Sequence, residues 1–213
     1  PEQDGYLQGM VDEVHAAGGV FIADEVQAGF ARVGAGMWGF ARHGVVPDIV
    51  TMGKPMGNGI PLSAAVFRPE VARDFGEQVR YFNTFGGSSV PIAAGAAVLD
   101  VFEQERVPER AERVGARLRA GIGALLADSP HVADVRGSGL LAAVEIVEDR
   151  DGRAPDRART TRVIDGMREQ RILISAAGPG VNVLKIRPPL AFDDADTDRF
   201  LESLEGVARR ELR

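Results

Sequence analysis

The 213-residue sequence contains no cysteine and only three histidines. Without cysteine, the chain forms no disulfide bond and offers no thiolate ligand to a metal. The histidines, His15, His43 and His131, lie too far apart in the sequence to indicate a local metal cluster. We therefore expect no metal site, and we interpret the three histidines as surface or packing residues.

Long hydrophobic runs and an excess of positive charge are also missing. No segment approaches the roughly 18 uninterrupted apolar residues of a membrane helix, and the chain does not start with a basic segment followed by an apolar one. The 31 acidic and 25 basic side chains give a formal net charge of -6, which argues against binding to a nucleic-acid backbone. We expect a cytoplasmic protein with small-molecule partners, no nucleic acid and no membrane.

The apolar content is that of a folded protein, with 45% hydrophobic and 26% charged residues. In the first half, helical patterns alternate with short apolar runs that are typical of strands buried on both faces. This pattern predicts an α/β architecture with a mostly parallel sheet. The expected strands are residues 20–24, 47–54 and 62–67, and the expected helices are residues 6–17, 88–105 and 108–127.

The second half of the sequence differs from the first. Two strand-like segments within residues 132–147 turn at a glycine, and the charged stretch 148–159 leads to further elements. These are a helix at 160–170, strands at 171–177 and 182–190, and a terminal helix that Asp193 or Asp194 can cap. We predict that residues 1–106 form part of a large α/β domain and that residues 107–213 form a small α+β domain.

Two charged side chains follow two of the expected strands. Asp24 ends the apolar run in "FIADEVQAGFARVG", and Lys54 ends the run in "PDIVTMGK". Parallel sheets bind ligands at the carboxyl ends of their strands, so we expect both side chains to face a common crevice. A lysine that forms an imine beside an acid that keeps a ring nitrogen protonated is the pair that pyridoxal phosphate requires.

Each motif also has a plain structural interpretation. An Asp-Glu pair after a strand is typical of a helix or loop cap, and a Gly-Lys pair is typical of a solvated turn. If Asp24 pairs with a cationic ring, we expect its carboxylate to be buried, because burying it unpaired would be prohibitive. Glu25 has no role in that chemistry, and we expect it to be a structural hydrogen-bonding residue at the strand end.

The blocks "FIADEVQAGFARVG", "PDIVTMGKPMGNGIPLSAAV" and "YFNTFGGSSVPIAAGAAVLDV" resemble the pyridoxal-phosphate-dependent class III aminotransferases of fold type I. With "VRGSGLLAAVEIV" and "NVLKIRPPL", the likeness covers essentially the whole chain. The resemblance implies that Asp24 pairs with the pyridine nitrogen, Val26 packs on a ring face and Gln27 lies near the ring hydroxyl. It further implies that Lys54 forms the Schiff base. Thr84 matches a threonine that reaches the cofactor phosphate of the neighbouring subunit, which implies a homodimer.

The remaining glycine-rich segments fit these roles. Residues 53–61 lack the residue order of a nucleotide-binding loop, so we interpret their glycines as turn-makers that aim Lys54 inward. Residues 85–91 can offer backbone N–H groups to a phosphate near Thr84, although a plain helix N-terminus explains them equally well. As catalytic residues we expect Asp24 and Lys54, whose amine, once displaced, moves a proton between the substrate carbon and the cofactor.

Strand alternation in "NVLKIRPPL" places Lys185 and Arg187 on one face, where both could meet an anionic substrate group or simply face solvent. Many family members have an arginine that binds a substrate carboxylate at the position of Lys185, and lysine lacks its bidentate fork. With lysine at this position, the sequence resembles the branch of alanine-glyoxylate aminotransferase-like proteins and ethanolamine-phosphate phospho-lyases. Arg136 is a weaker candidate for the substrate side.

We therefore predict an aminotransferase that moves an amino group from an amine or amino acid to a 2-oxo acid. One alternative is a phospho-lyase that acts on a phosphorylated amino alcohol such as ethanolamine phosphate, and another is a non-catalytic scaffold. Family members are roughly twice this long, and the chain begins with Pro1, so we expect it to lack an N-terminal half. In isolation we expect it to bind cofactor weakly and to be inactive.

Overall fold

The computed structural model describes residues 5–34 and 36–213. The chain divides into two compact units between Glu109 and Arg110, whereas the sequence placed the domain boundary after residue 106. Among the described residues, no helix has both the length and the hydropathy needed to cross a membrane.

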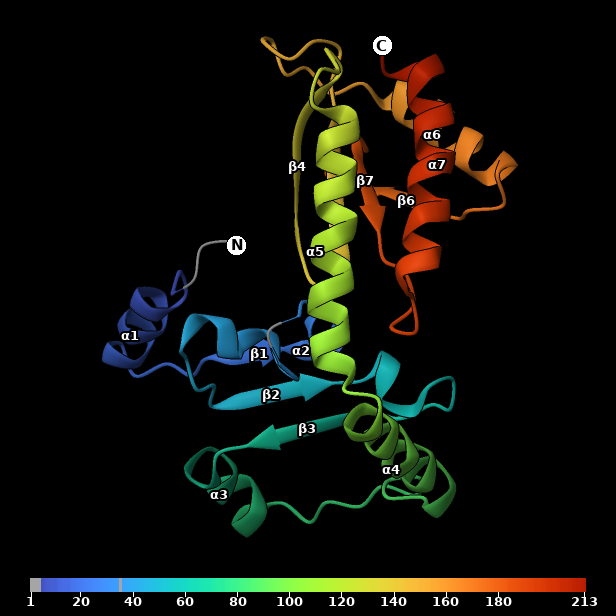
Figure 1. Ribbon diagram of the computed structural model, residues 1–213. Helices are drawn as coiled ribbons and strands as arrows, with labels where there is room; N and C mark the ends of the chain where they lie inside the picture. The colour runs from blue at the N-terminus through green and yellow to red at the C-terminus, as the bar shows by residue number, and fades with distance from the viewer. Residues whose placement is uncertain (1–4, 35) are drawn as a thin grey trace. The chain divides into compact units, whose positions relative to one another are not determined.

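The first unit contains a three-stranded sheet in the order β1-β2-β3. Figure 1 shows β1 and β2 pointing the same way and β3 pointing the opposite way, and the strand register agrees. The antiparallel direction of β3 was not evident from its apolar pattern. The elements of this unit are α1 (Gln8–Ala16), β1 (Ile22–Asp24), α2 (Glu25–Ala28), η1 (Gly39–His43), β2 (Ile49–Met52), η2 (Lys54–Gly57), β3 (Ala64–Phe67), α3 (Pro69–Gln78) and α4 (Ser89–Gln104).

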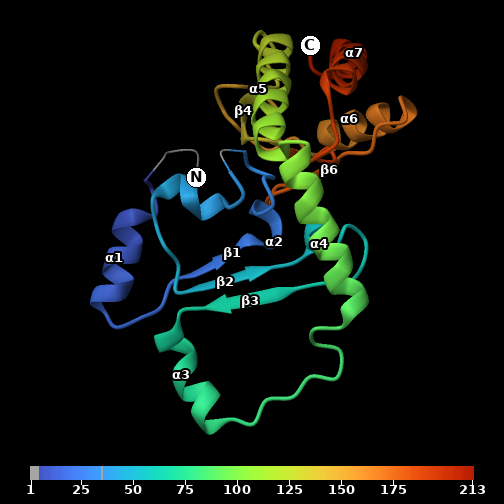
Figure 2. The ribbon, with the colours of Figure 1, turned by 60° about the horizontal axis from the view of Figure 1, so that its bottom comes forward.

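The helix α3 was not expected from the sequence, although it begins with a proline at its first position, where a missing N–H costs nothing. None of its residues is buried. The segment that follows it, up to α4, is an open loop that no other element covers in either view (Figures 1 and 2). Local sequence patterns therefore gave little indication of this part of the chain.

The second unit has its own hydrophobic core under a four-stranded antiparallel sheet of order β4-β5-β7-β6. Alternate residues of β5 and β7 are buried, and they form one cluster with residues of α5, α6 and α7. The three helices therefore cover a single face of the sheet. Its elements are α5 (Val107–Leu126), β4 (Val132–Ser138), β5 (Leu141–Ile146), α6 (Arg157–Glu169), β6 (Ser175–Ala177), β7 (Val183–Ile186) and α7 (Asp194–Glu211).

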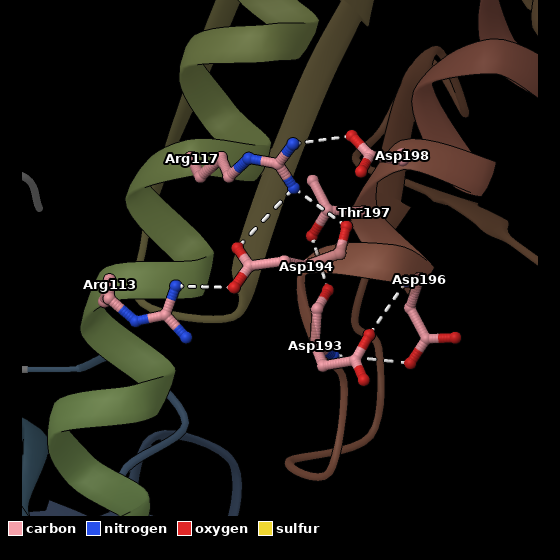
Figure 3. Close-up of polar contacts among 7 residues, drawn as sticks. All are labelled: Arg113, Arg117, Asp193, Asp194, Asp196, Thr197 and Asp198. Carbon is pink, nitrogen blue, oxygen red and sulfur yellow. Dashed lines mark hydrogen bonds and ion pairs between the residues drawn. The ribbon is translucent and has the colours of Figure 1, made fainter.

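The start of α7 is fixed by a capping box and by two arginines of α5 (Figure 3). Asp193 caps the helix by accepting the N–H of Asp196 at 2.9 Å, which decides between the two caps that the sequence allowed. Arg113 binds the Asp194 carboxylate at 2.7 Å, and Arg117 binds the Asp194 carbonyl oxygen at 2.8 Å. These contacts join the two helices at the edge of the core, although exposed ion pairs of this kind each contribute only about 0–1 kcal/mol.

Close packing of α5 on the turn between β4 and β5 depends on Gly115. A Cβ atom at this position would lie 2.0 Å from the carbonyl oxygen of Gly139. Arg119, one turn later, donates to the same oxygen. The helix and the turn are therefore in backbone contact, and no side chain fits between them.

We predict that Gly115→Ala destabilises the protein by about 1–3 kcal/mol or more, because backbone must shift to admit the methyl group. Gly123 lies in the same helix, and a Cβ atom there would have no neighbouring atom within 4 Å, so Gly123→Ala should instead stabilise by about 0.5–1 kcal/mol. Urea unfolding of the intact gene product measures both changes. Equal stability of the two variants would contradict the close approach.

Asp48 holds together the segments that enter the first sheet. Its Oδ2 accepts the N–H of Phe21 at 2.7 Å and lies 2.7 Å from Nε2 of His15 in α1. Arg68, which follows β3, lies 3.4 Å from Oδ1. The pKa of the Asp48 carboxyl is lowered from its ordinary value, mainly by the Phe21 N–H and then by the hydrogen bond with His15.

This shift makes Asp48 a source of acid sensitivity. Because its pKa is lower in the folded than in the unfolded state, the stabilisation is complete above the unfolded pKa of about 3.9 and is lost as the pH falls through the lower folded value. We predict that Asp48→Asn lowers the free energy of unfolding at pH 7 and that its difference from wild type shrinks below about pH 4. Urea unfolding between pH 7 and pH 3 tests this, with the exposed Asp74→Asn on α3 as a control. A difference that does not change with pH would refute it.

Candidate functional site

The two strand ends that the sequence singled out lie beside each other. β1 and β2 are parallel neighbours in which Asp24 is paired with Thr51, and Lys54 follows shortly after β2. The short helices that begin directly after these strands, α2 and η2, contact each other. Asp24 and Lys54 are thus carried by adjoining turns at the carboxyl ends of the two parallel strands, where α/β proteins bind ligands.

Asp24 is exposed, so the expectation that its carboxylate is buried was wrong. It is the N-cap of α2, and its Oδ1 accepts the N–H of Val26 at 3.0 Å. Water and this amide stabilise its charge, and no deep desolvation has to be compensated. No other hydrogen bond of the Asp24 side chain occurs in the part of the chain that the structure describes, so Oδ2 can meet a cation.

The buried carboxylate at this strand end belongs to Glu25, whose residue exposure is 3%. Its Oε2 accepts the N–H of Gly39 at 2.9 Å, and its Oε1 accepts the N–H of Phe40 at 2.8 Å. The interpretation of Glu25 as a structural hydrogen-bonding residue is therefore confirmed. Both partners of Glu25 are backbone N–H groups. The sequence pattern therefore contains no side chain that identifies them as its partners.

Val26 and Gln27 are half-buried on α2, immediately after Asp24 and Glu25. The helix is only four residues long and ends at Gly29, where a Cβ atom would lie 2.7 Å from the carbonyl oxygen of Glu25. The turn that carries the three candidate residues Asp24, Val26 and Gln27 is therefore compact and needs glycine at its end.

Lys54 has a backbone φ of 43°, a left-handed conformation that is costly for a residue with a side chain. Asn58 and Gly59, with φ values of 44° and 104°, complete the turn, as the glycine-rich pattern predicted. The Lys54 side chain is exposed. Strain of about 1–3 kcal/mol at a single residue is typical of functional positions that the surrounding structure holds in place.

The helix α4 contributes to holding this turn. α4 contacts η2, and a Cβ atom at Gly95 would lie 2.8 Å from Cδ2 of Leu62 and 3.6 Å from the Met56 carbonyl oxygen. The small residues of α4 let it approach the lysine turn closely.

Thr84 lies exposed in the loop between α3 and α4. Within the described residues it makes no hydrogen bond, so nothing in this chain ties it to Asp24 or Lys54. The loop is shaped by Asn83, whose Oδ1 accepts the N–H groups of Phe85 and Gly86 at 3.0 Å each. Asn before a Gly-Gly turn was the pattern from which this role could have been recognised.

The substrate-side candidates belong to the second unit. Lys185 lies on β7 between the buried Leu184 and Ile186, so its side chain is on the face opposite the core. Its neighbours in register are the small residues Ala143 and Ser175. Arg187 follows the strand and is exposed.

Arg136 lies in the same cross-strand row, because it is paired with Ala143 from the other side. Its Nη1 donates to Asp134 and to Glu145 at 2.8 Å each, and these hydrogen bonds raise the pKa of the guanidinium. The Lys185 side chain makes no hydrogen bond or ion pair with the described residues. Arg136 is therefore neutralised by its partners, and Lys185 is the cation of this row that can bind an anionic ligand.

Lys54 and Lys185 are also the only two lysines in the sequence. Ion pairs among the described residues use arginine or histidine as the cation, as in the contacts of Arg113 and Arg117. Only an amine can form an imine, and a lysine amine can lose its proton where arginine cannot. The two lysine amines of the sequence are thus Lys54, which we expected to bind the cofactor, and Lys185, which we expected to bind the substrate.

The donor set suits pyridoxal phosphate better than a metal. An amine and a carboxylate on adjoining turns match the aldehyde and the ring nitrogen of that cofactor. No group of three or more His, Asp or Glu side chains suitable for a metal ion occurs among residues 5–34 and 36–213.

Comparisons with known proteins agree with this assignment. The family model "Aminotransferase class-III" matches residues 1–207. The "Alanine--glyoxylate aminotransferase 2 homolog 2, mitochondrial" of Arabidopsis thaliana is 48% identical over 94% of this chain and 42% of its own length. The "Ethanolamine-phosphate phospho-lyase homolog 1" of Caenorhabditis elegans is 39% identical over 97% of this chain and 45% of its own length.

Solved structures give the same result. A phospholyase from Arthrobacter in complex with phosphoethanolamine has a TM-score of 0.93 and 44% identity, over 97% of this chain and 49% of that one. An amine transaminase from an uncultivated Pseudomonas species, in a PLP-bound form, has a TM-score of 0.87 and 31% identity over 97% and 48% of the two chains. The chain spans less than half the length of the curated relatives.

Proposed function

This chain belongs to the class III aminotransferase family, and on that premise we propose that it provides the lysine and the acid of a pyridoxal-phosphate-dependent aminotransferase. The proposed reaction moves an amino group from an amine or amino acid to a 2-oxo acid. The observation that supports it most directly is the adjacency of α2 and η2, which places Asp24 and Lys54 on adjoining turns.

Each candidate residue has a separate part in the proposed reaction. When bound, pyridoxal phosphate supplies an electron-poor ring that stabilises negative charge on the substrate carbon. Asp24 would keep a proton on the ring nitrogen through its free carboxylate oxygen, while its Oδ1 accepts the Val26 N–H. The Lys54 amine would hold the aldehyde carbon of the cofactor and, once displaced by the substrate, would move the proton from the substrate carbon to the cofactor. Val26 would pack on the ring and Gln27 would lie near the ring hydroxyl.

For the substrate side we propose Lys185 on β7, together with Arg187, which follows the strand. The isolated charge of Lys185 between the small residues Ala143 and Ser175 leaves room for an anionic group. Lysine binds such a group as a point charge, which suits a phosphate at least as well as a carboxylate.

Lys185 also favours a second candidate function, elimination of phosphate from a phosphorylated amino alcohol. The likeness to a phospholyase that was solved with phosphoethanolamine supports this candidate. The two reactions differ in what they need, because elimination releases phosphate without an acceptor, whereas transamination requires a 2-oxo acid.

We predict that borohydride reduction of the intact gene product with pyridoxal phosphate labels Lys54, the lysine that we assign to the aldehyde, and leaves Lys185, the other lysine of this sequence, unlabelled. Peptide mass spectrometry measures the label. Lys54→Ala should abolish it and lower turnover by about 10²–10⁴-fold or more, the contribution of a positioned acid-base group. Lys185→Arg should keep the label.

The same preparation separates the candidate functions. Phosphate release from phosphoethanolamine without added 2-oxo acid identifies the phospho-lyase, and a strict requirement for a 2-oxo acid identifies the aminotransferase. Full biological activity of Lys54→Ala would favour a non-catalytic scaffold over both.

A homodimer is part of this proposal. The helix α4 has no buried residue in the described structure, although it is rich in apolar side chains, and Val90 is 70% exposed. Phe82 and Phe85, on either side of Thr84, are 82% and 84% exposed. Exposed apolar surface of this extent is typical of a protein interface, and a second copy of the chain placed there would bring Thr84 to a neighbouring site.

We predict that Val90→Asp combined with Leu99→Asp converts a dimeric gene product into monomers, because two charges would be buried in the interface. Sedimentation equilibrium measures the change, and Val46→Asp, an exposed apolar position outside α4, is the matched control. A dimer that persists in the α4 variant would show that this helix is covered by other parts of the protein.

A further inference from the structure

Glu25 is a buried carboxylate that the proposed chemistry does not use. We propose that it is a positioning residue, which fastens residues 38–40 to the end of β1 and so fixes the turn on which Asp24 and Val26 meet the cofactor. This inference rests on the proposed function, because it assigns Glu25 a role at the same site.

The hydrogen bonds of Glu25 match its two oxygens to two consecutive backbone donors. Gly39 donates to Oε2 at 2.9 Å and Phe40 to Oε1 at 2.8 Å, and the residue is 3% exposed. Hydrogen bonds to an ionised carboxylate are roughly twice as strong as those between neutral groups. No ion pair of Glu25 occurs among the described residues, so these two amides are what stabilises its buried charge.

Two glycines make room for this carboxylate. A Cβ atom at Gly39 would lie 2.9 Å from the Ala28 Cβ and 3.4 Å from each oxygen of Glu25. A Cβ atom at Gly29 would lie 3.2 Å from Oε2. The surroundings of the Glu25 carboxylate, formed by Gly29, Gly39 and Phe40, are called the cradle below. A side chain at either glycine would press against the glutamate that the cradle holds.

The chain is strained directly after Gly29, where it leaves the cradle. Phe30 and Ala31 are both buried and both left-handed, with φ values of 56° and 60°. Trp38 packs edge-on against Phe30 with 5.4 Å between ring centroids, and Ala31 donates to the Met37 carbonyl oxygen at 3.1 Å. A loop in this conformation returns to the strand end only where strong contacts hold it, and Glu25 supplies two of them.

The turn that Glu25 holds has little stability of its own. α2 is a four-residue helix, far shorter than a helix that is stable by itself. Its geometry depends on the Asp24 cap at one end and on the Glu25 anchor beside it. Because Asp24 and Val26 are the direct neighbours of Glu25, loss of the anchor changes how both meet the ring.

Glu25→Gln tests the proposal, because glutamine keeps one acceptor oxygen but presents an NH₂ donor to the second amide. We expect the variant to fold and its Gly39 and Phe40 amides to exchange hydrogen faster than in wild type. We expect its dissociation constant for pyridoxal phosphate to rise about tenfold or more, the scale of one charge-assisted hydrogen bond. The pH titration of the visible cofactor absorbance should move to higher pH, because a less firmly protonated ring withdraws fewer electrons.

Gly39→Ala keeps Glu25 and obstructs its cradle from the other side. It should produce the same spectral shift, and the double variant should be no worse than the single variants, because both act through one contact. Glu70→Gln, an exposed glutamate on α3, should leave all three measurements unchanged.

Wild-type exchange, affinity and titration in Glu25→Gln would overturn the proposal. So would loss of folding in both Glu25→Gln and Glu25→Asp, because the role of Glu25 would then be structural alone. Failure of the proposed function is distinguishable, because wild type itself would then take no borohydride label at Lys54.

Discussion

The pairing of one buried carboxylate with two backbone amides governs the candidate site. Glu25 is able to lie under the end of β1 because Gly39 and Phe40 donate to both of its oxygens. That contact determines where the loop returns, and the loop in turn defines the turn on which Asp24 is exposed. Lys54 meets this turn because β2 runs parallel to β1 and α2 contacts η2. In our proposal, the Asp24 and Lys54 pair is thus positioned by a residue outside the proposed chemistry.

The two units of the chain are stabilised in different ways. The second unit encloses a continuous core between its sheet and three helices. The first unit leaves apolar side chains of α4 and of the preceding loop exposed and has few buried apolar residues of its own. Since burial of apolar surface is the main stabilising term in folding, the described residues of the first unit gain less of this stabilisation from one another than those of the second. The cofactor-side candidates Asp24 and Lys54 belong to this first unit.

The arginines and the lysines of this chain have different surroundings. Arginines such as Arg113, Arg117 and Arg136 lie in ion pairs, where a planar guanidinium with several donors is suited to hold carboxylates. The only two lysines are at the end of β2 and on the open face of β7. An amine with few partners remains available for an aldehyde or an anion. This division explains why Arg136, although it lies in the row of Lys185, is the weaker substrate candidate.

The sequence alone determined the family, the α/β class, most helices and strands, and the placement of Asp24 and Lys54 after two strands, because these depend on local periodicity and on short motifs. It also indicated that Asp193 or Asp194 caps α7. Only the tertiary structure decided that β3 is antiparallel and that Glu25, rather than Asp24, is the buried carboxylate. Asp24 and Glu25 are adjacent and chemically alike, and what separates them is a pair of amides that the fold brings from residues 39 and 40. Backbone donors leave no trace in side-chain identity, and for that reason the sequence could not reveal this choice.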